Sequence, residues 1–153
     1  MVAPAFQFTG QKVIDLSPEE LWERLMDPVI MKRCIPRCEV LEPIGERRFR
    51  VALKVSFGLI RGTFQGEAEL KDVVEPERYR LEMNARGTLG VVHGTTDIKL
   101  VPVDGGQRTE LIYSSEATIG GLISKVGAKF HEDAARNFTD QFFEQILSTP
   151  PQR

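Results

Sequence analysis

The residues able to bind a metal or carry out nucleophilic chemistry are few and scattered. The two cysteines, Cys34 and Cys38, lie close together, whereas the two histidines, His93 and His131, lie far from them in the sequence. A structural zinc site needs four such ligands, so no metal is expected. Two reduced, partly buried thiols are the simpler interpretation, and the sequence leaves open whether they have a redox role.

His93 has the same strand parity as the charged residues Asp97 and Lys99. Side chains alternate between the two faces of a strand, so in a regular strand His93 points outward to solvent. A bulge at Gly90 or Gly94 would turn it inward. An exposed surface histidine is the favoured interpretation.

Tyr113 and His131 are the only residues that could form an acid/base pair. His131 adjoins Phe130 in a long helical pattern and falls at the edge of its apolar face, and Tyr113 falls on the apolar face of a predicted strand. General acid/base catalysis needs such groups to converge on a substrate. A boundary histidine without a function is favoured over a catalytic one.

Length and composition bound the class of protein. The chain has 153 residues and a net charge of -2, with 41% hydrophobic and 27% charged residues. This size suits one domain, predicted over residues 1–147, followed by a polar tail over 148–153. The interspersed charges give no nucleic-acid patch. The sequence has no long apolar run and no basic-then-apolar leader, which predicts a cytoplasmic protein.

The elements near the amino terminus have clear start and stop signals. A strand is predicted over 6–16, and Ser17, Pro18 and Glu20 then form a capping box that begins a helix. This helix should end at Asp27, because the residue before a proline disfavours the helical conformation. A second short helix is predicted over 29–33.

A series of strands joined by short turns follows. Alternation of apolar and polar residues gives each strand one buried and one wet face. The glycine-rich segment 87–94 predicts a turn and a strand that other atoms approach closely. The predicted strands after the helices cover residues 39–42, 47–57, 64–71, 79–85, 96–100 and 109–117.

The stretch 122–147 is predicted as one amphipathic helix. Its apolar and small residues recur every four positions, which places them in a ridge on one face. Three phenylalanines on this ridge need a large apolar partner, which the apolar face of the sheet supplies. The ridge consists of Leu122, Val126, Phe130, Ala134, Phe138, Phe142 and Ile146.

The order of elements predicts an α+β protein in which an antiparallel sheet packs on one carboxy-terminal helix. The inner face of this sheet is apolar except for Thr96, Ser115 and the Tyr113 hydroxyl. Both a packed core and a cavity for an apolar ligand with one or two hydrogen-bonding ends satisfy this pattern.

Several short motifs, taken in order, resemble a known family. The resemblance is to the carbon monoxide dehydrogenase CoxG family, within the START-like (SRPBCC) superfamily, and it runs from about residue 6 to 147. The motifs are Phe8-x-Gly10, Leu21-Trp22-x-x-Leu25-x-Asp27-Pro28, Cys34-Ile35-Pro36-x-Cys38-Glu39, Phe64-x-Gly66, Gly87-x-x-Gly90-x-x-x-Gly94, and Gly120-Gly121 with Gly127 and Phe142-Phe143.

The resemblance implies the helix-grip fold of START domains and birch-pollen-allergen-like proteins: a curved antiparallel sheet wrapped around a long carboxy-terminal helix, with two short helices after the first strand. It also implies a hydrophobic cavity for an apolar small molecule, such as a lipid, isoprenoid or quinone-like compound, and no cofactor. The expected ligand-binding residues are Trp22, Ile35, Val55, Phe57, Phe64, Met83, Thr96, Tyr113, Ser115, Val126, Phe130, His131, Ala134 and Phe138.

The resemblance further implies a non-catalytic role beside a molybdenum hydroxylase of the carbon monoxide dehydrogenase type, in its maturation or its association with the membrane. Two alternatives stay open. One is an enzyme of the polyketide cyclase or dehydratase kind that uses His131 or Tyr113, and the other is an assembly factor recognised through its surface.

Three positions depart from the family pattern. Arg37 stands where the family usually has glycine, and His131 stands where the helix usually carries an apolar residue. Members that attach to membranes often continue past the helix, whereas this sequence ends at Arg153. The resemblance therefore predicts that any membrane contact is indirect.

Overall fold

The computed structural model describes residues 5–57, 60–125 and 128–148. Strand β1 (Ala5–Ile14) leads into two short helices, α1 (Pro18–Met26) and α2 (Pro28–Cys34), and α3 (Ala128–Ser148) follows the last strand. The six strands between α2 and α3 are β2 (Cys38–Gly45), β3 (Arg48–Phe57), β4 (Ile60–Val74), β5 (Arg78–Gly87), β6 (Gly90–Val103) and β7 (Arg108–Gly120).

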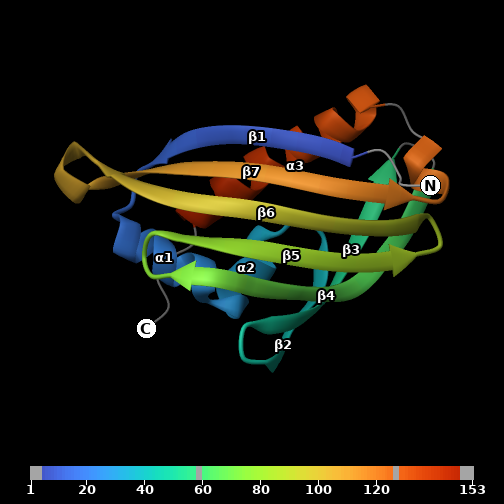
Figure 1. Cartoon of the computed structure of the whole chain (residues 1–153), viewed down its shortest axis with the longest axis horizontal. Helices are drawn as coiled ribbons and strands as arrows, with labels where there is room; N and C mark the ends of the chain where they lie inside the picture. Colours follow the sequence, from blue (N-terminus) through green and yellow to red (C-terminus); the bar gives the residue numbers. More distant parts are fainter. Residues whose placement is uncertain (1–4, 58–59, 126–127, 149–153) are drawn as a thin grey trace.

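The seven strands form one antiparallel sheet in the order β1-β7-β6-β5-β4-β3-β2. The sheet curves, and α3 runs along its inner, concave face, behind the strands in Figure 1. In the described part of the chain no helix crosses the outer face. The predicted α+β helix-grip architecture is confirmed.

The capping box predicted at the start of α1 is confirmed. The Ser17 hydroxyl accepts a hydrogen bond from the Glu20 amide at 3.2 Å, and the Glu20 carboxylate accepts one from the Ser17 amide at 3.1 Å. The Asp27 carboxylate then accepts from the Val29 amide at 2.9 Å and caps α2. These bonds satisfy amides that have no partner within their own helix.

The larger apolar cluster lies at one end of the sheet, which we call the closed end, between α1, α2 and the last turns of α3. Ile14, Leu21 and Ile146 are fully buried there, and each contributes about 1.5–3 kcal/mol by burial. Trp22 packs edge-on against Tyr79, with ring centroids 5.6 Å apart. The closed end therefore carries most of the described core.

Arg24 of α1 joins the closed-end core to the end of α3. Its side chain is buried, and its Nη1 donates a hydrogen bond to the Ile146 carbonyl at 2.5 Å. The last carbonyls of a helix have no partner within the helix. Arg24 supplies that partner and complements the negative end of the helix dipole.

A smaller cluster occupies the opposite, open end of the sheet. Phe64 and Leu89 are buried there against partly buried neighbours from β3, β5, β6 and β7. The β5–β6 turn meets the segment after β7 so closely that a Cβ on Gly121 would lie 2.6 Å from the Gly90 Cα. Gly121 also has φ +86°, so this contact requires glycine.

The prediction of a single helix over 122–147 is wrong at the amino-terminal end of that range. Residues Leu122–Lys125 form a short 3-10 helix (η2), α3 begins at Ala128, and Val126 and Gly127 lie outside the described residues. The Ser124 amide donates to the Gly121 carbonyl at 3.1 Å, a spacing of three residues. The tighter winding takes Leu122 off the predicted ridge, and its side chain is 61% exposed.

Several predicted strands are also too short, most of all the one predicted over 96–100, because β6 covers Gly90–Val103. Strand β4 covers Ile60–Val74 rather than 64–71, and β2 continues through Pro43 to Gly45 rather than ending at Glu42. The proline that suggested a turn is tolerated because β2 is an edge strand, where a backbone amide on the outer side needs no partner.

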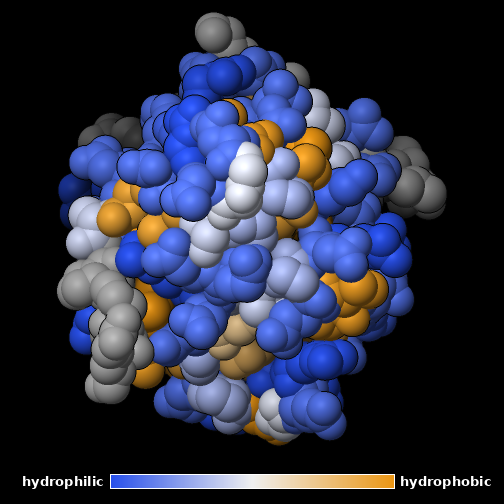
Figure 2. Space-filling model, turned by 90° about the vertical axis from the view of Figure 1, so that its left-hand side faces the viewer, coloured by the Kyte–Doolittle hydropathy of each residue, from blue (hydrophilic) through white to orange (hydrophobic). Residues whose placement is uncertain are grey.

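Figure 2 shows the closed end of the molecule from outside. Hydrophilic side chains cover most of this face, and apolar side chains occur in separate small patches. Among the helices of the described ranges, none is long and apolar enough to cross a membrane.

Candidate ligand-binding site

The inner face of the sheet carries a block of small residues between its two apolar clusters. Gly94 and Thr96 of β6 lie directly across from Ala117 and Ser115 of β7, so four small residues form one block. These residues face the side of the sheet that α3 covers, yet each keeps part of its surface accessible. Residues in close-packed interiors are fully buried, so this block is a candidate floor for a ligand between the sheet and α3. We call this block and the space above it the inner hollow.

Larger side chains surround the inner hollow. Leu81 and Met83 of β5 flank it on one side, and Phe6 and Phe8 of β1 flank it on the other. The inner hollow therefore has apolar side chains at its rim and small side chains at its floor. Such a shape suits an apolar molecule with a limited polar part.

The polar part of the inner hollow is a pair of hydroxyls. Thr96 Oγ1 and Ser115 Oγ lie 2.9 Å apart and share a hydrogen bond. Each hydroxyl has one hydrogen and two acceptor sites, so the pair uses one hydrogen and retains the other. The pair can therefore bind one polar end of an otherwise apolar ligand.

Tyr113 lies beside the hydroxyl pair and contacts α3. Its ring stacks on Phe8 at 5.8 Å and lies 6.0 Å from the ring of Phe143, and its hydroxyl bonds to Thr139. Burial, and then the negative charge of Asp140, raise the pKa of Tyr113. The phenol stays protonated at neutral pH and acts as a hydrogen-bonding group rather than a base.

His131 does not join Tyr113. Its ring meets the edge of Phe6, with centroids 6.0 Å apart, near the start of α3. Thr139, the partner of Tyr113, lies eight residues further along α3, which corresponds to about 12 Å of helix. His131 and Tyr113 therefore lie at different levels along α3 and do not form the acid/base pair that the sequence allowed.

The other residues expected at the ligand site are dispersed. Met83 flanks the inner hollow, whereas Val55 and Phe64 belong to the open-end cluster, and Trp22 belongs to the closed-end core. On α3, Ala134 is half-buried and Phe138 is 40% exposed. The side chains of Phe57 and Phe130, and all of Val126, lie outside the described residues.

The cysteine corner lies away from the inner hollow. Ile35, Arg37 and Cys34 line a separate pocket of about 330 Å³ against α3. Arg37 has φ +58°, a left-handed conformation that glycine adopts without strain. Cys38 donates to the Val40 carbonyl at 3.3 Å, and burial raises the pKa of this thiol.

Cys34 and Cys38 do not form a disulfide, and Cys34 is fully buried. No cluster of three or more residues able to hold a metal ion occurs in the described ranges.

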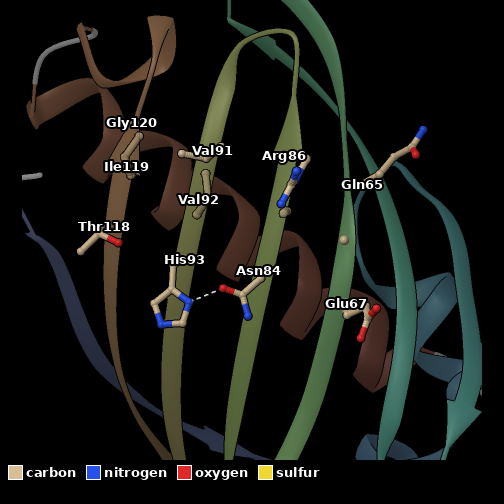
Figure 3. Close-up of a pocket in the computed structure, with 12 residues that line it drawn as sticks. Gln65, Glu67, Asn84, Arg86, Val91, Val92, His93, Thr118, Ile119 and Gly120 are labelled. Carbon is tan, nitrogen blue, oxygen red and sulfur yellow. Dashed lines mark hydrogen bonds between the residues drawn. The ribbon is translucent and has the colours of Figure 1, made fainter.

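A polar depression on the outer face was not foreseen from the sequence. It includes His93, which points outward as the strand parity predicted, and Asn84, whose side-chain oxygen bonds to His93 Nδ1 (Figure 3). Alternation marks this face as wet but does not reveal a hollow in it. The register of four strands is needed to bring its residues together.

A curved antiparallel sheet that holds a long helix against its concave face defines the START-like class of proteins. Similar solved structures support this class. A conserved protein from Geobacillus kaustophilus has a TM-score of 0.87 and 30% identity, with 92% of each chain covered. A START superfamily protein from Mycobacterium smegmatis has a TM-score of 0.68 and 11% identity, with 93% of this chain and 94% of that chain covered. Ara h 8.0201 has a TM-score of 0.66 and 15% identity, over 94% and 96% of the two chains.

Within this class, the family described as the CoxG subunit of carbon monoxide dehydrogenase matches residues 10–149. The chain belongs to that family. The name of the family links it to carbon monoxide dehydrogenase. No curated protein matches the sequence.

Proposed function

We propose that the protein holds an apolar small molecule in the inner hollow and serves a molybdenum hydroxylase of the carbon monoxide dehydrogenase type without catalysing a reaction itself. A lipid, an isoprenoid or a quinone-like compound has the required chemistry. The observation that carries the proposal is the accessible block of small residues opposite α3, at Gly94, Thr96, Ser115 and Ala117.

The polarity of the inner hollow supports a ligand with an uncharged polar end. The hydroxyls of Thr96 and Ser115 can donate to and accept from a carbonyl or hydroxyl group. Two nearby cations make cation–π contacts rather than facing the inner hollow as free charges. Lys12 Nζ lies 5.7 Å from the ring centre of Phe143, and the Arg136 guanidinium lies 5.8 Å from the ring centre of Phe8.

A non-enzymatic role agrees with the separation of His131 from Tyr113. General acid/base catalysis needs both groups within reach of one substrate. His131 lies near the start of α3 against Phe6, whereas Tyr113 contacts Thr139, eight residues further along the helix. The raised pKa of Tyr113 also makes it a poor base. No observation favours the cyclase-like alternative over binding.

Ligand binding can be tested with the neutral fluorescent probe N-phenyl-1-naphthylamine. Ala117→Phe places a ring in the inner hollow, because Ala117 belongs to its block of small residues and lies directly across from Gly94. We expect micromolar binding to the native protein and a loss of roughly tenfold or more in the variant. The matched control is Ser114→Phe, on the exposed outer face of the same strand.

Two results would defeat the binding proposal: no micromolar binding of the probe, or equal binding by the native and Ala117→Phe proteins. Native mass spectrometry of protein isolated from its own source would identify a retained ligand. The partner is tested separately by co-purification with the hydroxylase. Retention of the hydroxylase by a folded Ala117→Phe protein would favour an assembly factor recognised through its surface.

A further inference from the structure

The outer face of the sheet carries a second depression, of about 470 Å³, that crosses β4 to β7 near the open end. It lies on the side of the sheet away from α3 (Figure 3). Its volume is within the range of small-molecule sites. Six side chains are important to its chemistry: Gln65, Asn84, Arg86, Val91, His93 and Thr118.

Strand register places these side chains together on the outer face. Asn84 lies across from His93, and His93 lies across from Thr118. His93 and Thr118 are each three positions from Thr96 and Ser115, which face the inner hollow. Because side chains alternate, an odd separation puts the two sets on opposite faces of the sheet.

The charge of the depression is unbalanced at Arg86. Some cations elsewhere on this face pair with acids across the strands, as Arg80 does with Asp97 at 2.8 Å, whereas Arg78 lies across from another cation, Lys99. The cross-strand neighbours of Arg86 are Gln65 and Val91, neither of which is acidic. Within the described residues, Arg86 has no ion pair and no side-chain hydrogen bond.

The one carboxylate that lines the depression is already neutralised. Glu67 is paired with Arg48 of β3. Because the carboxylate of Glu67 is already paired with Arg48, it has little attraction left for the guanidinium of Arg86. The guanidinium of Arg86 therefore gives the depression a net positive charge.

The uncharged groups add hydrogen-bond donors. Asn84 Oδ1 is bonded to His93 Nδ1, and since an amide oxygen only accepts, the ring nitrogen donates. This bond orients the Asn84 side chain, whose amide nitrogen retains its two hydrogens. The Thr118 hydroxyl adds another donor, and Val91 adds an apolar side chain next to Arg86.

We propose that the outer depression binds a small carboxylate. The planar guanidinium of Arg86 matches the two oxygens of a carboxylate, and the Asn84 amide lies two residues away on the same face of β5. Val91 contacts the hydrocarbon part of the ligand. An exposed ion pair binds weakly, so the dissociation constant is on the order of millimolar. The site is separate from the inner hollow and does not depend on its ligand.

The test is a titration of the whole chain with benzoate, followed by NMR of the backbone amides. We expect saturable shifts at residues 84–86, 91–93 and 118–120. Benzamide has the same ring and shape without the charge, and it should produce no saturable change. Arg86→Gln should weaken benzoate binding by roughly tenfold, the loss expected for a charge-assisted hydrogen bond.

Arg78→Gln is the matched control. Arg78 lies on the same face of β5 at the opposite end of the strand, so this variant loses the same charge outside the depression. It should bind benzoate as the native protein does. The proposal is overturned if benzoate gives no saturable shifts, if benzamide binds equally well, or if a folded Arg86→Gln protein binds benzoate unchanged.

A failure of this test would not affect the proposed inner ligand. Binding of N-phenyl-1-naphthylamine to the inner hollow should be the same in Arg86→Gln and in the native protein, because the sheet separates the two sites.

Discussion

Arg24→Met should destabilise the protein more than the loss of a surface charge would. The Arg24 side chain is 8% exposed, and its Nη1 donates to the Ile146 carbonyl at 2.5 Å. Methionine keeps an apolar stem of similar length but offers no donor. The variant therefore removes the bond between α1 and the last turn of α3 while retaining much of the packing.

The magnitude follows from the type of bond. A hydrogen bond from a charged donor contributes about 1.5–3 kcal/mol, and its loss leaves a carbonyl without a partner. For a chain of this size each kcal/mol shifts the thermal midpoint by about 2–4 °C. We expect Arg24→Met to lower the free energy of unfolding by about 2 kcal/mol. This loss corresponds to a thermal midpoint lower by about 4–8 °C. Arg24→Lys keeps a charged donor and should lose less.

Urea unfolding followed by tryptophan fluorescence provides the assay. Trp22 is the single tryptophan, is 4% exposed and lies on the same helix as Arg24. Arg80→Met is the control, because its surface ion pair with Asp97 should contribute only about 0–1 kcal/mol. If the two variants unfold at the same urea concentration, Arg24 does not anchor α3.

Three further predictions concern the inner face and the cysteine corner. Gly10→Ala would place a Cβ too close to the Tyr113 hydroxyl oxygen for van der Waals contact, and should cost about 1–3 kcal/mol; an unchanged urea midpoint would contradict this. Burial raises the pKa of both Tyr79 and Tyr113. The folded state then keeps protons that the unfolded state releases, so stability should fall as the pH rises above about 10; urea midpoints measured across this range should decrease, and a flat profile would be inconsistent with buried phenols. Iodoacetamide should modify Cys38 more slowly than a free thiol and fully buried Cys34 only on unfolding; mass spectrometry showing rapid labelling of both would refute it.

The parts of the fold that local chemistry determines were predictable. Ser17 and Glu20 determine the start of α1 by bonds within one turn, and Asp27 determines the start of α2 in the same way. The alternation of β3 likewise needs no partner to be recognised. In each case the deciding interactions lie within a few residues.

The break before α3 was not predictable, because a contact distant in sequence determines it. Gly121 takes a left-handed conformation where it meets Gly90 of the β5–β6 turn. The four-residue spacing of the ridge continues through Leu122 regardless of that contact. The spacing of apolar residues therefore predicted a helix that begins before the actual start of α3.

The candidate site was predictable only as a set of inward-facing residues. Parity places Thr96 and Ser115 on the inner face, but their pairing depends on strand register, and a slip of one residue would turn them outward. The distance between His131 and Tyr113 depends on where α3 lies along the sheet. Neither register nor helix position follows from the spacing of apolar residues.

The unequal distribution of buried residues along the sheet bears on how such a scaffold can acquire new binding preferences. Fully buried Ile14, Leu21 and Ile146 gather beside the short helices, while Thr96 and Ser115 remain partly accessible. Replacing a small floor residue by a somewhat larger or smaller one changes the shape offered to a ligand but removes little of the surface that stabilises the chain. Selection, or a protein engineer, can therefore vary what the molecule carries while its capacity to fold is preserved elsewhere.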